Sequence, residues 1–272
     1  MTRKLQIQNF KGGVGKTTTA VNLSHGLALK GRRVLLIDLD QQGNASDMLG
    51  VKVAKSQPTL YNLLVDDLAY DQVIVEARPN FFIIPSDKRT AMAENIISAQ
   101  PGRELALTVR LSEVSGYDYI VLDCPPALNV MHNNALLYSN ELIIPIDMDR
   151  LALQGAKGIL DSAAELEKVF KYSAGICGVL PTFIDRRTNI THQVMKVIET
   201  RYAPKVLPPI RSDAKLRQAS AHGKTIFEYD SHSKGADDYR AVTEAIIEQE
   251  SSLSAGATSG EPAQYVEEAR QV

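Results

Sequence analysis

The chain has 272 residues, of which 44% are hydrophobic, and it carries a formal net charge of −2. This length and apolar content can bury one substantial α/β core. No apolar run approaches the roughly 20 residues that span a bilayer, and the first predicted strand follows Met1 almost at once, which leaves no room for a signal peptide. A cytosolic protein is therefore expected. Its two cysteines, Cys124 and Cys177, have no metal-ligand spacing and fall in predicted buried strands, so reduced thiols are expected rather than a disulfide.

The first predicted elements are a strand at residues 5–10 and a helix at residues 17–30, whose apolar side chains fall on one stripe. Between them, residues 11–18 read KGGVGKTT, which matches the spacing of a phosphate-binding loop. Three glycines let the backbone turn its N–H groups inward, and the helix adds the positive end of its dipole. The alternative is an incidental glycine-rich turn, but the strand, loop and helix order favours a phosphate site. The predicted nucleotide-binding residues of the loop are Lys11, Gly12, Gly13, Val14, Gly15, Lys16, Thr17 and Thr18.

Within the loop, the side chains suggest separate roles. Lys16 would reach the β and γ phosphates as a point charge, and the Thr17 hydroxyl would ligate Mg²⁺. Thr18 would support the loop. Lys11 is an additional lysine, since phosphate-loop chemistry itself requires only Lys16. The segment thus predicts a nucleotide-driven switch.

Two apolar runs farther along the chain end in acidic residues. Residues 33–40 read RVLLIDLD and residues 117–123 read YDYIVLD, and continuous apolar runs of this kind are typical of strands covered on both faces. Their last carboxylates, Asp38, Asp40 and Asp123, are expected at the carboxyl edge of the sheet, where doubly wound sheets bind ligands. For Asp38 and Asp40, the alternative is an acidic strand end that caps the next loop.

Two later strands are predicted at residues 141–147 and 174–180, separated by a helix from about residue 153 to residue 170. Strands that alternate with helices predict an α/β fold with a doubly wound, mostly parallel sheet and helices on both faces. We expect a single domain over residues 1–250.

The net charge hides an asymmetry between the two ends of the chain. From Glu244 onward six acidic residues face one arginine, a net charge of −5, which leaves +3 for residues 1–243 out of the total of −2. After Glu250 the composition shifts to serine, glycine and alanine, which is too polar and too small to form a core. Residues 251–272 are therefore predicted to be a flexible acidic tail.

Basic residues cluster in the last third of the predicted domain. Ser212 as N-cap and Gly223 as the C′ residue predict a helix within this segment. On it, Arg211 and Lys215 would share a side, whereas Arg217 would point in another direction. By charge alone, a solvated surface is the commoner explanation. The basic residues of the segment are Arg201, Lys205, Arg211, Lys215, Arg217 and Lys224.

Taken together, these motifs resemble the deviant phosphate-loop family of ParA, Soj and MinD ATPases. Lys11 stands where that family has its signature lysine, residues 33–44 resemble its second signature, and residues 117–126 resemble its third. Residues 181–188 and 223–226 are similar to later ParA and Soj segments. The resemblance covers nearly all of the predicted domain and is nearer to ParA and Soj than to MinD.

The resemblance implies an ATPase that uses ATP and Mg²⁺ and forms a homodimer when ATP is bound. Lys11 would cross the dimer interface to the partner's phosphates. Asp40 would position or polarise the attacking water, and Asp38 would support the metal shell. Asp123 would hold Mg²⁺ through water, beside the direct ligand Thr17. The catalytic residues that the resemblance implies are Lys11, Lys16 and Asp40.

The resemblance also suggests where the adenine binds. The family reads the base after the strand that ends near Thr182 and in the segment around Pro209, so Thr182, Phe183 and Pro209 are the candidates. The common family order Ile-Pro-Arg appears here as Pro-Ile-Arg at residues 209–211, which leaves the adenine contact open. A core position is the alternative for Phe183.

In ParA and Soj proteins the basic segment contributes to sequence-independent DNA binding by the ATP-bound dimer. Arg211, Lys215 and Arg217 are therefore the predicted DNA-binding residues, and Lys215 falls where the Soj pattern has a basic residue. The resemblance implies double-stranded DNA and a ParB-like centromere-binding or cargo-adaptor protein as partners, and a cytoplasmic, nucleoid-associated location. The cargo would be a plasmid, a chromosome origin or a protein body.

Two other classes of function remain as alternatives. A MinD-like membrane-cycling regulator would have a basic amphipathic C-terminal helix, whereas this tail is acidic, so no membrane partner is expected. A metabolic ATPase resembling nitrogenase iron protein would need cysteines that bridge the dimer through a metal cluster. Cys124, inside a predicted strand, is poorly placed for that role.

Overall fold

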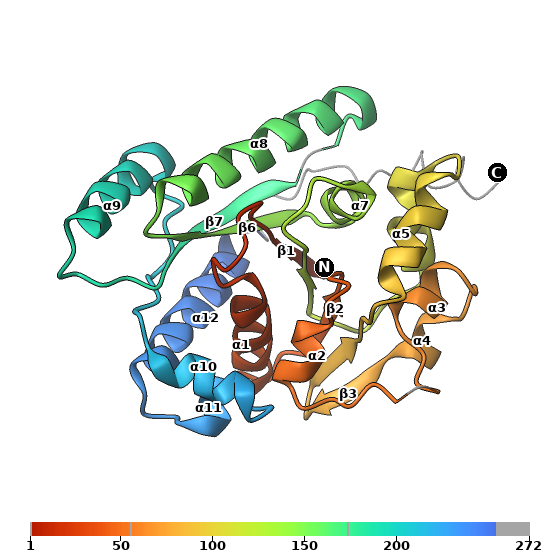
Figure 1. Ribbon diagram of the computed structural model, residues 1–272, viewed down its shortest axis with the longest axis horizontal. Coiled ribbons are helices and arrows are strands. Elements are labelled where there is room, and N and C mark those ends of the chain that lie inside the picture. The colour runs from red at the N-terminus through yellow and green to blue at the C-terminus, as the bar shows by residue number, and fades with distance from the viewer. Residues whose placement is uncertain (1, 55, 173, 254–272) are drawn as a thin grey trace.

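The computed structural model describes residues 2–54, 56–172 and 174–253, and it has one β-sheet between two layers of helices (Figure 1). The strands are β1 Arg3–Ile7, β2 Val34–Asp38, β3 Val75–Arg78, β4 Phe81–Ile84, β5 Tyr119–Asp123, β6 Glu141–Asp147 and β7 Gly175–Thr182. Their order in the sheet is β3-β4-β2-β5-β1-β6-β7. Neighbouring strands are parallel except β3 and β4. The predicted doubly wound, mostly parallel sheet is confirmed.

The central strands explain why the sequence shows continuous apolar runs. Every residue of β2 and β5 is buried, because helices cover both faces of the sheet. Adjacent residues pack on opposite faces: Leu36 belongs to the core on one side and Leu35 to the core on the other. The parallel register pairs Asp38 with Asp123, so both strands deliver a carboxylate to the same edge of the sheet.

The helices divide between the two faces of the sheet (Figure 1). They are α1 Lys16–Leu29, α2 Asn44–Met48, α3 Leu60–Leu64, α4 Tyr70–Val73, α5 Thr90–Ser98, α6 Ala106–Arg110, α7 Val130–Tyr138, α8 Arg150–Phe170, α9 Asn189–Tyr202, α10 Ala214–Ala221, α11 Ile226–Tyr229 and α12 Lys234–Leu253, with a 3-10 turn at Arg103–Leu105. One face packs mainly against α1 and α12, with α2, α10 and α11 beside them. On the other face, α3 to α7 cover one half and α8 and α9 the other.

Two helix starts differ from the sequence prediction because an aspartate caps each of them. Helix α8 begins at Arg150, since the Asp149 carboxylate accepts a hydrogen bond from the Leu151 N–H at 2.8 Å. For α10 the predicted N-cap, Ser212, was wrong by one residue: the Asp213 carboxylate caps the helix instead.

The predicted end of helix α10 is close to the observed one. Gly223 lies just past α10 in the left-handed region, with φ +63°, as expected of a C′ glycine. Helix α12 continues to Leu253, three residues beyond the predicted domain end. The rest of the predicted tail, residues 254–272, lies outside the described residues.

Both cysteines are buried and free, as predicted. Burial raises the pKa of the Cys124 and Cys177 thiols, so neither is activated as a thiolate. Among the described helices, none is long and apolar enough to cross a membrane.

Candidate nucleotide-binding site

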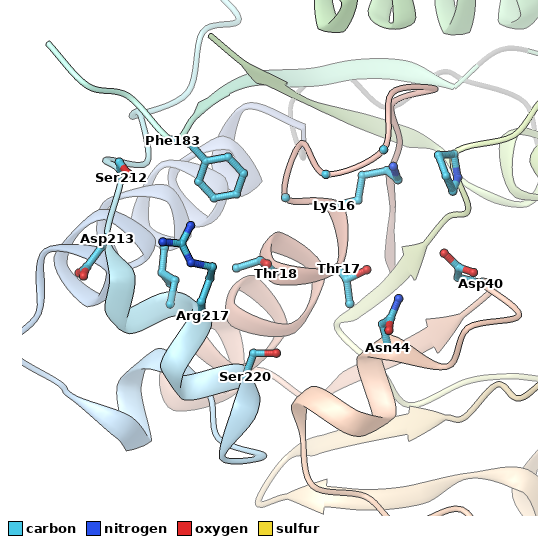
Figure 2. A pocket seen from close by; sticks show the side chains of 15 residues that line it. Lys16, Thr17, Thr18, Asp40, Asn44, Phe183, Ser212, Asp213, Arg217 and Ser220 are labelled. Atoms are coloured by element: carbon cyan, nitrogen blue, oxygen red, sulfur yellow. The ribbon is translucent and has the colours of Figure 1, made fainter. Parts of the chain in front are cut away.

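A cavity of about 680 Å³ opens at the carboxyl edge of the sheet, between the loop that follows β1, the end of β7 and helix α10 (Figure 2). This volume lies within the range of roughly 300–1,000 Å³ that small-molecule sites occupy. The lining residues are Gly12, Gly13, Gly15, Lys16, Thr17, Thr18, Asp40, Asn44, Pro126, Phe183, Ser212, Asp213, Leu216, Arg217 and Ser220. The cavity therefore brings the predicted loop together with residues some 200 positions away in the sequence.

The glycine-rich loop is held tightly against β7. Gly15 has φ +88°, and a Cβ at this position would lie 3.0 Å from the Phe183 ring, so the turn and the close approach both require glycine. The next contact lies below the loop, where the Thr182 hydroxyl donates to the carbonyl of buried Val14 at 2.9 Å. The loop is thereby fixed before any phosphate binds.

Lys16 extends into the cavity from the start of α1 (Figure 2). Its ammonium donates to the Lys11 carbonyl at 3.0 Å, and no ion pair of Lys16 occurs within the described chain. Burial lowers the pKa of Lys16, and the nearby carboxylates of Asp123 and Asp40 offset part of that effect. A phosphate would supply the anion that this desolvated cation lacks.

Lys11 has a different environment, although it belongs to the same loop. Its ammonium contacts the carboxylates of Asp147 at 2.6 Å and Asp149 at 3.3 Å, and it is not among the cavity-lining residues. Burial acts to lower the pKa of Lys11, but the hydrogen bonds to these two carboxylates outweigh it and raise the pKa. The second lysine is therefore held by the end of β6 and the cap of α8 in its own chain.

Asp123 offers a buried carboxylate beside the loop. Neither of its oxygens has a hydrogen-bond partner in the described parts of the chain. Burial raises the pKa of Asp123 to about 7, and the neighbouring Thr17 hydroxyl offsets part of this rise. A carboxylate and a hydroxyl next to a phosphate site are the oxygen donors that Mg²⁺ prefers. These residues therefore fit the predicted magnesium site.

The two acidic residues at the end of β2 point in different directions. Asp38 is fully buried and its oxygens accept hydrogen bonds from the backbone N–H groups of Asp40 at 3.1 Å and Ala45 at 3.2 Å. Burial, with the adjacent Asp123 carboxylate, raises the pKa of Asp38 well above its usual range. Asp40 lines the cavity, as does Asn44, which the sequence interpretation missed. Asp38 is thus placed to shape the loop, and Asp40 to reach a ligand.

Of the three residues predicted to bind the adenine, one lines the opposite end of the cavity and two do not. Phe183 lines the cavity from a left-handed backbone position, φ +54°. Thr182 lies buried beneath the loop, and neither it nor Pro209 is a lining residue. Sequence reasoning missed Pro126, Ser212, Asp213, Leu216 and Ser220.

The predicted DNA-binding residues are not in equivalent surroundings. Arg211 pairs with Asp238 through guanidinium contacts of 2.7 and 2.9 Å, and Lys215 pairs with Asp230. Arg217, which the sequence grouped with them, lies on the cavity wall instead.

The loop lies where doubly wound sheets bind ligands, and the charges beside it fit a phosphate and Mg²⁺, so the chain is in the class of phosphate-loop nucleotide-binding proteins. A family model described as an AAA domain matches residues 2–175. The sporulation initiation inhibitor protein Soj of Bacillus subtilis is 39% identical over 249 residues, which cover 90% of this chain and 98% of Soj. The chain belongs to the family of ParA/MinD-type partition ATPases.

Other relatives and solved structures extend the comparison. The chromosome partitioning protein ParA of Myxococcus xanthus is 32% identical, with 93% of this chain and 90% of ParA covered. Apo McdA from Cyanothece has a TM-score of 0.81 at 27% identity, covering 90% of this chain and 100% of McdA. Cobyrinic acid a,c-diamide synthase from Mycobacterium smegmatis, solved with an ATP analogue and magnesium, has a TM-score of 0.80 at 31% identity, covering 93% and 97%. One fold thus serves proteins with different names, and function has to be argued from the site.

Proposed function

We propose that this protein is an ATP-dependent dimerising switch that binds DNA without sequence preference and hydrolyses ATP to segregate or position a cargo. The cargo would be a plasmid, a chromosome origin or a protein body. The similarity to Soj and ParA over most of both chains supports a partition role. The observation that carries the proposal is the position of Lys11, which pairs with Asp147 and does not line the cavity that Lys16 lines.

Lys11 supports a dimer for an electrostatic reason. Lys16 already reaches the cavity, so the phosphates of a nucleotide bound in the same chain do not require Lys11 as well. If two copies pair through this face, each Lys11 leaves Asp147 and Asp149 and binds the phosphates of the partner. The phosphates of ATP then replace Asp147 and Asp149 as the anionic partners of the two lysines, and without ATP each lysine would lose its carboxylates for nothing. Dimerisation therefore depends on the bound nucleotide.

The groups around the cavity support a mechanism for ATP hydrolysis. Water attacks the γ-phosphorus in line, and the bond to the bridging oxygen of ADP breaks. Mg²⁺, held by Thr17 and through water by Asp123, would neutralise charge on the phosphates. Lys16 stabilises the charge that develops on the γ-phosphoryl oxygens, and Asp40 positions the water.

Turnover is proposed to be slow until a partner protein acts. One carboxylate oxygen of Asp40 accepts a hydrogen bond from the Gln42 N–H at 3.0 Å, so this residue is engaged by its own loop. A ParB-like centromere-binding or cargo-adaptor protein that shifts this loop would free the carboxylate for the water. The proposed location is the cytoplasm, in association with the nucleoid.

DNA binding is proposed for the surface that contains Arg211 and Lys215. Each residue is paired with an aspartate of its own chain, so a monomer offers few free cations to DNA phosphates. Pairing two copies roughly doubles the number of phosphates that are engaged at once. Each neutralised phosphate adds about 0.9 to the slope of log affinity against log salt, so the dimer binds more tightly and with a steeper slope.

The test is a fluorescence-anisotropy titration of two unrelated duplexes at several salt concentrations, with ATP or ADP. The Asp40→Ala background holds the ATP dimer. We expect DNA binding with ATP but not with ADP, at equal affinity for the two duplexes. The double variant Arg211→Glu/Lys215→Glu should lose affinity for both duplexes, because phosphate contacts do not distinguish bases. Lys88→Glu, an exposed change two residues before α5, is the matched control, since α5 and α10 lie on opposite sides of the molecule (Figure 1). Strong preference for one duplex, or unaltered binding by the double variant, contradicts the proposal.

A MinD-like membrane cycle is the second candidate. It is favoured by the solved MinD of Pyrococcus horikoshii with Mg-ADP, which has a TM-score of 0.75 at 25% identity and covers 94% of this chain. Liposome flotation with ATP separates the two candidates. We expect no flotation, and clear ATP-dependent flotation would replace the nucleoid with a membrane as the platform.

A further inference from the structure

Helix α10 presents one of its sides to the nucleotide cavity. Four of the lining residues fall at positions i, i+3, i+4 and i+7, the spacing that puts side chains on one face of a helix. They are Asp213, Leu216, Arg217 and Ser220. Lys215 lies outside this set and pairs with Asp230. Two basic residues two positions apart thus have different surroundings, one in the cavity and one outside it.

The charge of Arg217 has no partner in the described part of the chain, where this guanidinium makes neither an ion pair nor a hydrogen bond. Asp213, one helical turn earlier, does not neutralise it. One carboxylate oxygen of Asp213 accepts the Lys215 N–H at 2.9 Å, and the other accepts the Gly235 N–H at 3.0 Å. Asp213 therefore fixes the start of α10, and the Arg217 guanidinium remains available to a ligand.

The shape of the cavity determines which part of a nucleotide reaches Arg217. Lys16, Thr17 and Asp40 lie toward one end, where the phosphates bind (Figure 2). Phe183 and Arg217 lie toward the other end, with Thr18 between the two groups. A nucleotide is longer than its phosphates, so its nucleoside has to extend past Thr18 toward Phe183 and Arg217.

We propose that Arg217 is a positioning residue for the nucleotide: its guanidinium stacks on the base in the part of the cavity that Phe183 borders. The proposal rests on the nucleotide-binding function argued above and assigns one of its contacts. A guanidinium is planar, stacks on aromatic faces and is weakly hydrated, so it suits the face of a purine better than a lysine ammonium does. The base in turn covers a cation that has no partner among the described residues.

The experiment measures the affinity of the full chain for MgADP and for magnesium pyrophosphate by calorimetry. The two ligands share the phosphate end and differ in the nucleoside. Arg217→Gln should weaken MgADP by about tenfold, as for a desolvated cation–π contact, and leave pyrophosphate unchanged. Arg217→Lys should lose most of the same affinity, because lysine retains the charge but not the planar face. Arg201→Gln, an exposed change near the end of α9, is the matched control and should bind both ligands as the unmodified protein does.

Three results would overturn the assignment. An equal loss for pyrophosphate would make Arg217 a phosphate ligand, full rescue by Arg217→Lys would show that only its charge matters, and unchanged MgADP affinity in Arg217→Gln would exclude it from the site. Arg217 is exposed, so its substitution should leave the melting temperature unchanged, which confirms that the variants are folded. Failure of the unmodified chain to bind MgADP would instead contradict the proposed function itself.

Discussion

The phosphate end of the cavity and the outer surface of the α10 region differ in whether their charged side chains already have partners. At the phosphate end, Lys16 has no ion pair and Asp123 has no hydrogen-bond partner, within the described residues. On the α10 side, Arg211 and Lys215 are each paired with a carboxylate of the same chain. The first region is preorganised for a ligand, whereas the second has to exchange existing partners for new ones.

This difference determines how strongly substitutions in each region should affect ligand binding. A buried, unpaired charge interacts strongly with a ligand of opposite sign, because little water screens it. An exposed ion pair such as that of Lys215 with Asp230 contributes little, and salt screens it further. Substitutions at the phosphate end should therefore have large effects on nucleotide binding, and those on the outer surface should have graded, salt-dependent effects.

The largest effect is expected from Lys16→Ala. This change removes the only loop ammonium that lines the cavity among the described residues, so the affinity for MgATP should fall by about a hundredfold or more. Calorimetric titration with MgATP measures it. Lys196→Ala, an exposed change on α9, should bind normally. A Lys16→Ala protein with nearly normal affinity would break the distinction between the two regions.

A smaller effect should follow from releasing Lys11. Asp147→Asn keeps the shape of the side chain but removes the charge that Lys11 contacts at 2.6 Å. A half-buried ion pair of this kind contributes about 1 kcal/mol, and a dimer breaks one in each copy, so the concentration for half-maximal ATP-dependent dimerisation should fall by about thirtyfold. Analytical ultracentrifugation at several protein concentrations would measure this shift. Unchanged or weaker dimerisation in Asp147→Asn would show that the ion pair does not compete with the interface.

The smallest effect concerns pH and the unpaired Asp123. Its folded-state pKa of about 7 lies above the unfolded value near 3.9, so the folded state holds the extra proton between these values. The stability from Asp123 is thus complete at low pH and declines as the pH rises through about 7. Relative to Asp123→Asn, the ligand-free protein should lose a few degrees of melting temperature between about pH 5 and pH 8.

The comparison with Asp123→Asn reports the titration of Asp123 together with its effect on Asp38, because the Asp123 carboxylate helps to raise the pKa of Asp38. His132, whose pKa burial lowers to about 4, remains in both proteins. Differential scanning fluorimetry without nucleotide or Mg²⁺ gives the two pH profiles. Parallel profiles would mean that Asp123 is already ionised in the folded state.

How much could be predicted from the sequence depended on whether a feature is local. The strand at residues 141–147 and the loop at residues 11–18 were predicted because a buried parallel strand and a glycine turn each have a continuous signature. The partner of Lys11 was not predicted, because Asp147 lies 136 positions away in the sequence. It comes close only because β1 and β6 are adjacent in the sheet.

Helix α10 shows the same limit. The helix itself was predicted, and so was the separation of Arg217 from Lys215, because helical spacing fixes which residues share a side. What each side faces depends on the sheet order and on the packing of α10 beside the loop, which no local pattern encodes. The half-buried edge strand β3 was missed as well, because its four residues show neither a continuous apolar run nor full burial.

The most direct test of the central claim is the mass of the Asp40→Ala protein by size-exclusion chromatography with light scattering. With ATP we expect about twice the monomer mass of 29.8 kDa, and with ADP the monomer mass. Adding Lys11→Ala should return the ATP sample to the monomer mass, while calorimetry still detects ATP binding. A monomer with ATP in Asp40→Ala, or a dimer that persists without Lys11, would contradict an ATP-dependent switch that operates through this lysine.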